Sequence, residues 1–216
     1  MELNKTNSLV ELFFEKYKEK KEFKNQPFLK WLKTDKNDFL TWDQVKNKIC
    51  LLSEYLEENL SEGDRCVLLS ENRPEWLIAD IAIMNAGGVT VPLFTTYSEK
   101  DYEYIINDCN PKICIVSNDI QFKKIEKFIS NETKVISIEN FDKKIKSISD
   151  ILESNPKKET INILENYNDK ILRKDLACII YTSGTTGNPK GVMLSHGGIL
   201  SNCEGAEEIL DTLVKR

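Results

Sequence analysis

The sequence predicts an α/β fold in which a mostly parallel sheet is flanked by helices. The first observation is that apolar segments of strand length alternate with amphipathic segments of helical period between residues 66 and 138. The second is that helix start signals stand where this alternation needs them, as with Pro74 in a first helical turn. The third is an ordinary globular composition, 40% hydrophobic and 30% charged over 216 residues, which allows a sizeable buried core.

The N-terminal segment is predicted to contain two amphipathic helices and two short strands. Apolar residues at helical spacing indicate a first helix over residues 6–22, with lysines and glutamates on its outer side. Short apolar stretches at 28–31 and 39–40 are typical of strands around a polar turn. Thr41 opens a second helix through a capping box, and Gly63 is predicted to stop it.

Strands and helices then alternate in a way that is typical of a parallel sheet. Parallel neighbours need a crossover connection, and a helix usually provides it. The predicted order is strand 66–69, helix 74–86, strand 89–93, helix 98–109, strand 113–116, helix 121–129 and strand 135–138.

The segment 139–170 interrupts this pattern. It is rich in Lys, Asn, Glu and Ser and has weak periodicity, which predicts a short helix and a mobile connection at the surface. Beyond it, strands are predicted at 176–181 and 192–194, followed by a helix over 199–213.

The most unusual stretch is residues 176–196, which read LACIIYTSGTTGNPKGVMLSH. Between two apolar runs it holds a loop of three glycines, four hydroxyl residues and one lysine. Glycines let the backbone approach a ligand and turn its N–H groups inward, hydroxyls donate to phosphate oxygens or reach a metal, and lysine supplies charge. The loop therefore predicts a polyphosphate site, whose candidate residues are Thr182, Ser183, Gly184, Thr185, Thr186, Gly187 and Lys190.

Two other interpretations of this loop were weighed. A Walker A loop needs Gly, four residues, and then Gly-Lys-Ser/Thr leading into a helix. Here Lys190 precedes Gly191, and a strand is predicted to follow. A glycine-rich hairpin turn explains any one of these residues, but an ordinary turn needs only one or two of them.

Charge and cysteine usage exclude several other classes. Lys plus Arg total 30 against 35 for Asp plus Glu, a net charge of -5, so we expect no nucleic-acid partner. The start has no secretory signal and no apolar segment is long enough for a membrane anchor, so we expect a soluble cytoplasmic protein. Six cysteines without a CxxC pair and a single histidine make a Cys/His zinc site improbable.

Residues 176–196 closely resemble the AMP-binding signature of the adenylate-forming superfamily, which includes acyl-CoA synthetases, luciferases and the adenylation domains of peptide synthetases. The resemblance covers about residues 9–213 and is closest to the N-terminal part of a long-chain fatty acid–CoA ligase. It implies the N-terminal portion of the large domain of such an enzyme, with a phosphate loop between two strands. The upstream blocks that agree are Leu40-Thr41-Trp42, Asn72-Arg73-Pro74-Glu75-Trp76, Ala86-Gly87-Gly88-Val89 and Val91-Pro92-Leu93.

The resemblance implies a two-step ligase that uses ATP, Mg²⁺ and coenzyme A. A carboxylate attacks the α-phosphate to give an acyl-adenylate, and the thiol then displaces AMP. By the same resemblance Lys190 is the predicted catalytic contact, Thr182 is the hydroxyl that touches magnesium, and the loop as a whole holds the β- and γ-phosphates. His196 has two open interpretations, a position near the acyl-adenylate pocket or a cap on the following helix. The block around Arg73 is predicted to serve folding.

The resemblance also implies that residues 1–216 are an incomplete N-terminal domain and that a C-terminal domain is absent, so the chain alone is expected to be inactive. The expected partners are a fatty acid or other carboxylate and the remainder of a split enzyme. A peripheral position on a membrane is the alternative to the cytoplasm, because enzymes that act on fatty acids can associate with membranes. Two functional alternatives remain open, an amino-acid or aryl-acid adenylating enzyme and a non-catalytic nucleotide-binding module.

Overall fold

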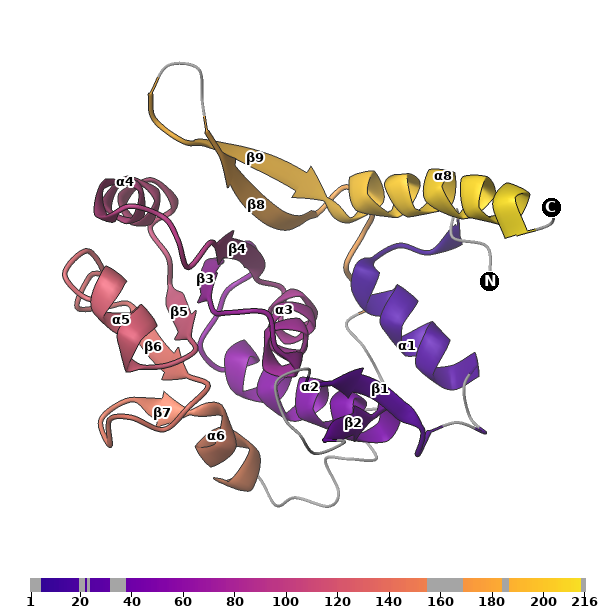
Figure 1. Ribbon diagram of the computed structural model, residues 1–216, viewed down its shortest axis with the longest axis horizontal. Helices are drawn as coiled ribbons and strands as arrows, with labels where there is room; N and C mark the ends of the chain where they lie inside the picture. The colour runs from indigo at the N-terminus through magenta and orange to yellow at the C-terminus, as the bar shows by residue number, and fades with distance from the viewer. Residues whose placement is uncertain are drawn as a thin grey trace.

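The computed structural model describes residues 5–19, 22, 24–31, 38–154, 169–183 and 187–214, the side chains of 208 and 211–214 excepted. A seven-stranded sheet with helices on both faces forms its centre, and a two-stranded hairpin stands beside it (Figure 1). The elements are α1 (Leu9–Glu19), β1 (Pro27–Lys30), β2 (Phe39–Thr41), α2 (Trp42–Glu57), β3 (Arg65–Leu69), α3 (Pro74–Asn85), β4 (Val89–Leu93), α4 (Glu99–Cys109), β5 (Ile113–Val116), α5 (Asp119–Ile125), β6 (Lys134–Ser137), β7 (Lys146–Ser147), α6 (Ile148–Ser154), β8 (Leu176–Thr182), β9 (Lys190–Ser195) and α8 (His196–Val214).

The sheet confirms the predicted α/β class and its mostly parallel character. The strand order is β7-β6-β5-β3-β4-β8-β9, and neighbouring strands are parallel except for β8 and β9, which pair antiparallel. The chain passes from β3 to β4 on one side and then crosses to β5 on the other side of β3. The crevice between the carboxyl ends of β3 and β5 is therefore the topological switch point.

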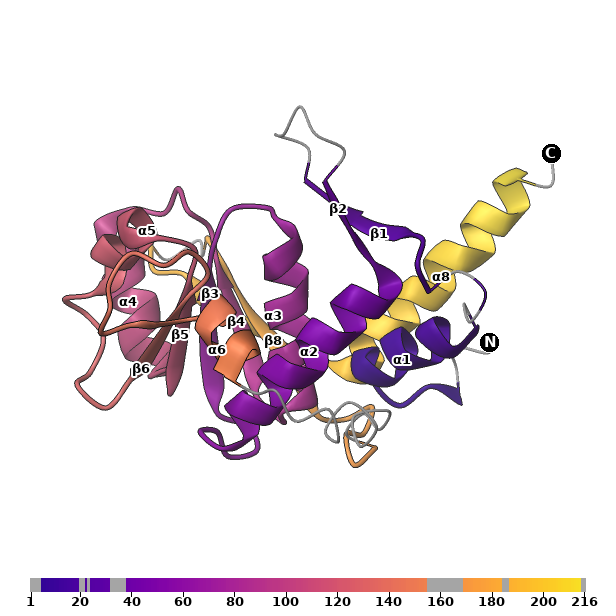
Figure 2. The ribbon, with the colours of Figure 1, turned by 90° about the horizontal axis from the view of Figure 1, so that it is seen from below.

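Two apolar layers hold the helices against the sheet. Helices α1, α2, α3 and α6 pack on one face, where Leu68 and Ile115 point, and α4 and α5 pack on the other face, where Val67 and Cys114 point. Because successive strand residues face opposite sides, one apolar run supplies both layers. Figure 2 shows the strands lying between these two groups of helices.

The predicted start of α2 is confirmed, but its predicted end is wrong. The Thr41 hydroxyl accepts a hydrogen bond from the Gln44 N–H and the Gln44 side chain accepts one from the Thr41 N–H, which completes the capping box. The helix ends at Glu57 rather than Gly63, because the Asn59 amide donates to the Tyr55 carbonyl at 2.6 Å and competes with the helical hydrogen bonds. Gly63 instead has a φ of 79° in the turn that leads to β3.

Two other helices begin before the residues predicted. Helix α5 starts at Asp119 rather than residue 121, because the Asn118 side chain accepts from the Gln121 N–H, and it ends at Ile125. Helix α8 starts at His196 rather than residue 199, and the Ser195 hydroxyl accepts from the Gly198 N–H at 3.1 Å. In both cases a side chain one residue earlier satisfies the first turn.

The segment 139–170 contains the predicted short helix, α6, and also a strand that the sequence did not predict. Strand β7 has only two residues, Lys146 and Ser147, which pair in parallel with Ile136 and Ser137 of β6. Residues 155–168 of the predicted connection lie outside the described residues. Among the helices that the structure describes, none is long and apolar enough to cross a membrane.

Candidate functional site

The predicted phosphate loop closes the hairpin between β8 and β9. Thr182 and Lys190 lie directly opposite each other as the last pair of this antiparallel ladder, and both are exposed. Since β8 runs parallel to β4, the loop lies at the carboxyl edge of the parallel strands, the edge at which ligands bind in open α/β sheets. Figure 1 shows the hairpin extending beyond the rest of the sheet.

The structure describes only the two ends of the predicted loop. Ser183 and Gly187 are exposed beside the Thr182–Lys190 pair. Gly184, Thr185 and Thr186 lie outside the described residues, so their predicted contacts with phosphate stay predictions. The structure therefore places two hydroxyl residues, Thr182 and Ser183, and the Lys190 ammonium group at the mouth of the loop.

Two glycines of this segment are required by its geometry. Gly187 has a φ of 96°, a backbone conformation that L side chains rarely adopt. At Gly191 a β-carbon would lie 2.9 Å from Ile179 Cγ2 and 3.2 Å from the Tyr181 ring. The strand after Lys190 thus lies close against the ring of the residue that begins the loop.

Tyr181 anchors the start of the loop to α4, a role that the sequence analysis missed. Its ring is buried, and its hydroxyl donates to Asp108 Oδ2 at 2.5 Å. The Tyr97 hydroxyl donates to the Tyr181 carbonyl at 2.9 Å. Burial and the neighbouring Asp108 both raise the pKa of the Tyr181 hydroxyl. Asp108 lies on the exposed side of a helix far away in sequence, so no sequence pattern marks it.

His196 lies at the opposite end of the hairpin, where β9 passes into α8. Its side chain is only 2% exposed, and Nδ1 accepts a hydrogen bond from the Leu9 N–H of α1 at 3.2 Å. The predicted alternative of a cap on its own helix is wrong, since Ser195 has that role. His196 instead caps the N-terminus of a different helix, and its predicted position near an acyl-adenylate pocket stays a prediction.

Acid should reduce the stability of the folded chain through His196. Burial lowers the pKa of this imidazole to about 4, with Asp175 acting in the opposite direction. As the pH falls below about 6.5, the unfolded chain takes up this proton first, so stability present above pH 6.5 is lost down to about pH 4. The loss is up to about 3 kcal/mol at ~1.4 kcal/mol per pKa unit.

To measure this loss, the free energy of unfolding of wild type and of His196→Asn is determined at pH 7 and at pH 4.5. The difference between the two proteins should be smaller at pH 4.5 than at pH 7. The comparison cancels Asp80, whose burial raises its pKa to about 6 and which changes stability with pH in the opposite sense. If the difference between the two proteins is the same at both pH values, the assignment of a neutral buried imidazole is wrong.

The residue after His196 allows no side chain. At Gly197 a β-carbon would lie 2.8 Å from the Arg173 carbonyl oxygen, and the Gly197 N–H donates to that oxygen at 2.7 Å. Gly197→Ala should therefore cost about 1–3 kcal/mol, as overpacking against backbone does. Gly198→Ala is the matched control, because its nearest contact is 3.4 Å and alanine favours a helix by up to about 1 kcal/mol. Equal unfolding midpoints for the two variants would contradict this account.

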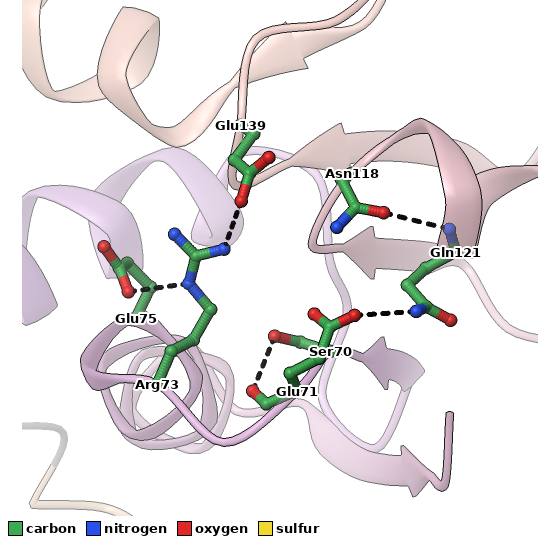
Figure 3. Close-up of polar contacts among 7 residues, drawn as sticks. All are labelled: Ser70, Glu71, Arg73, Glu75, Asn118, Gln121 and Glu139. Carbon is green, nitrogen blue, oxygen red and sulfur yellow. Dashed lines mark hydrogen bonds and ion pairs between the residues drawn. The ribbon is translucent and has the colours of Figure 1, made fainter. Parts of the chain in front are cut away.

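The switch point is occupied by a polar network of the chain itself. Arg73 Nε donates to Glu75 at 2.9 Å and its Nη1 to Glu139 at 2.6 Å, while the Gln121 amide donates to Glu71 at 2.7 Å (Figure 3). The network borders a cavity of about 670 Å³ that also reaches β1. Because two carboxylates already compensate the Arg73 charge, the geometry agrees with a folding role for this block.

Metal ligands are not clustered in the part of the chain that the structure describes. No group of three or more His, Cys, Asp or Glu side chains there could hold a metal ion. All six cysteines are free, and four of them are buried.

The fold and the hairpin define an α/β protein whose candidate ligand loop lies at the carboxyl edge of a parallel sheet. A family model described as "AMP-binding enzyme" matches residues 16–214. The chain belongs to this family.

The curated relatives include acyl-CoA ligases. Fatty acyl-CoA synthetase A of Dictyostelium discoideum is 31% identical over 165 residues, which is 71% of this chain and 24% of that protein. Long-chain-fatty-acid--CoA ligase 6 of Rattus norvegicus is 31% identical over 200 residues, which is 81% of this chain and 27% of that protein. The chain thus spans about a quarter of the length of these relatives.

Solved structures of adenylate-forming enzymes have the same fold. The anthranilate CoA ligase AuaEII in complex with anthranoyl-AMP matches with a TM-score of 0.73 and 22% identity, over 91% of this chain and 36% of that one. A red-emitting luciferase from Phrixothrix hirtus matches with a TM-score of 0.76 and 19% identity, over 90% of this chain and 37% of that one. At these identities the likeness establishes the fold alone.

Proposed function

We propose that this chain supplies the triphosphate-binding loop of an AMP-forming acid–thiol ligase whose acid is a long-chain fatty acid. The observation that carries the proposal is the pairing of Thr182 with Lys190 at the mouth of a glycine- and hydroxyl-rich loop. Family membership and the curated fatty acid–CoA ligases at 31% identity support the reaction and the acid.

In this proposal the residues of the loop stabilise charge on the departing pyrophosphate. The exposed Lys190 ammonium lies across the ladder from Thr182, so the two side chains can contact the same phosphate group. Such a charge-assisted contact is most useful when it strengthens as the leaving group gains charge. The bond from Tyr181 to Asp108 keeps the first strand of the loop in place, so less reorganisation accompanies binding.

The residues present fit a magnesium ion that is bound mainly through the nucleotide. Mg²⁺ keeps several waters and uses substrate phosphates with one or two protein oxygens. The exposed Thr182 hydroxyl would be such an oxygen. When bound, the ion supplies neutralisation of phosphate charge during displacement at the α-phosphate.

The acid and the thiol are assigned from the curated relatives. The solved neighbours include a ligase of an aryl acid, and amino-acid activation is a further alternative within the same superfamily. The identity of 31% to fatty acid–CoA ligases favours a fatty acid, with coenzyme A as the acceptor.

The test is acid-dependent exchange of labelled pyrophosphate into ATP by this chain together with the remainder of the enzyme, because the chain alone is expected to be inactive. Palmitate should support the exchange, whereas anthranilate and the twenty amino acids should not. Exchange with an aryl acid or an amino acid instead would overturn the choice of fatty acid. If MgATP binds but no acid supports pyrophosphate exchange, the protein is a non-catalytic nucleotide-binding module and not part of a ligase.

A further inference from the structure

The base of the phosphate hairpin and the N-terminus of α1 meet at one buried junction. The His196 N–H donates to the Asp175 carbonyl at 3.0 Å, which joins the residue after β9 to the residue before β8. The His196 imidazole accepts from the Leu9 N–H at 3.2 Å. His196 therefore joins the two ends of the hairpin through its backbone N–H and holds them against the first residue of α1 through its imidazole.

The bond to Leu9 satisfies a donor that α1 cannot satisfy itself. The first N–H groups of a helix have no partner within the helix. In α1 the Ser8 hydroxyl accepts from the Glu11 N–H at 3.0 Å, and His196 takes the Leu9 N–H. Because Nδ1 is the acceptor, the ring is neutral and carries its hydrogen on Nε2.

Arg173 makes a second connection at the same place. Its Nη1 donates to the Thr6 carbonyl at 2.8 Å, and its Nη2 pairs with Glu204 of α8 at 3.3 Å. Its own carbonyl accepts the Gly197 N–H at 2.7 Å. The segment before β8, the start of α8 and the N-terminus of α1 thus form one unit. Figure 2 shows α1 lying beside α8 at this end of the molecule.

The hairpin itself has few other supports. Val192 and Met193 of β9 are 43% and 67% exposed, and among the described strands only β8 pairs with β9. The direction in which the hairpin presents Lys190 therefore depends on the pairing of β8 with β4, on the Tyr181 anchor near the loop and on the junction at its base. A change at the junction is therefore expected to change the orientation of β9 along its whole length.

We propose that His196 is a positioning residue through which α1 controls the phosphate loop. This inference rests on the proposed binding of MgATP at that loop. When α1 is docked, the hairpin is held in its binding geometry, and binding at the loop in turn stabilises the docked α1. The coupling is reciprocal, as any coupling free energy between two sites must be.

The test removes the Leu9 N–H without changing His196. Leu9→Pro does this at the first position of a helix, where proline is well tolerated, and Leu9→Ala is the matched control for loss of the leucine side chain. The affinity for MgATP should be at least about five-fold lower in Leu9→Pro than in Leu9→Ala. The amides of α1 should also exchange more slowly with MgATP present in Leu9→Ala, but not in Leu9→Pro.

A second pair of variants tests the histidine itself, and one further variant tests specificity. His196→Leu removes the acceptor, whereas His196→Asn keeps one in its side-chain carbonyl and should restore most of the affinity. Tyr17→Phe removes the bond from the far end of α1 to Asp43 at 2.6 Å and should leave the affinity unchanged. Such a pattern follows from positioning and not from a general loss of stability.

The outcomes separate this inference from the proposed function. Equal affinities for Leu9→Pro and Leu9→Ala, with wild type binding MgATP, would overturn the coupling and leave the proposed function intact. If wild type does not bind MgATP, the proposed function fails. The coupling between α1 and the hairpin is then measured by amide hydrogen exchange alone. Faster amide exchange over residues 190–195 in Leu9→Pro than in Leu9→Ala then supports the coupling, and equal amide exchange overturns it.

Discussion

Replacing Lys190 by alanine should weaken the binding of MgATP roughly 10- to 150-fold. A hydrogen bond to a charged group contributes about 1.5–3 kcal/mol. Each 1.4 kcal/mol corresponds to about a factor of ten in the dissociation constant. Lys190 is exposed and lies opposite Thr182, so its loss removes the charge at the mouth of the loop and leaves the strand pairing intact. Titration calorimetry with MgATP measures the change.

Two control variants make this result specific to the loop. Lys190→Arg keeps the charge and should retain most of the affinity. Lys174→Ala removes another exposed lysine, away from the loop, and should have little effect. If Lys174→Ala weakens binding as much as Lys190→Ala, net charge rather than a local contact governs binding, and the role given to Lys190 is wrong.

Leu68→Ala should destabilise the folded chain by about 2–5 kcal/mol. Leu68 is fully buried in β3, a central strand with β4 on one side and β5 on the other. Truncation removes apolar contacts and leaves a cavity that a close-packed sheet cannot collapse to fill. Urea denaturation followed by circular dichroism measures the loss.

The matched control is Ile120→Ala, because Ile120 is 67% exposed on α5. This substitution should change the free energy of unfolding by no more than about 0.5 kcal/mol. A loss at Leu68 similar to that at Ile120 would show that β3 is not the centre of the cooperative core.

The hairpin of β8 and β9 is separate from the crevice that the sheet topology favours as a ligand site. Open α/β sheets bind ligands where the strand order reverses, which here is between β3 and β5. In this chain Arg73 bridges Glu75 and Glu139 at that point. The candidate site lies instead at the end of β8, two strands away from β3, where the sequence is rich in glycine and hydroxyl residues.

Short-range signals in the sequence predicted most of the elements. The capping boxes at Thr41 and Ser98 are local hydrogen-bond patterns of four residues, and both are present in the structure. Proline at position 74 and the apolar runs of β3, β4 and β5 are local in the same way. Element ends were less predictable, because Asn59 and Asn118 act through side-chain bonds that compete with the periodic pattern.

The candidate site was likewise predictable only in part. The composition of residues 182–190 indicated a phosphate loop, since glycine, hydroxyl and lysine side chains carry that chemistry in their covalent structure. The supports of the loop were not predictable. Asp108 binds Tyr181 from 73 residues away, and Leu9 binds His196 from 187 residues away.

The sequence by itself determined the α/β class, the family and the prediction of a phosphate loop, because these depend on residue types and on spacings of a few positions. The tertiary structure alone decided the strand order, the two-residue strand β7 and the junction of His196 with α1. Each of these joins segments distant in the chain, and such contacts form only after the apolar layers have brought the segments together. No local pattern of residues records which distant backbone group will lie within hydrogen-bond distance.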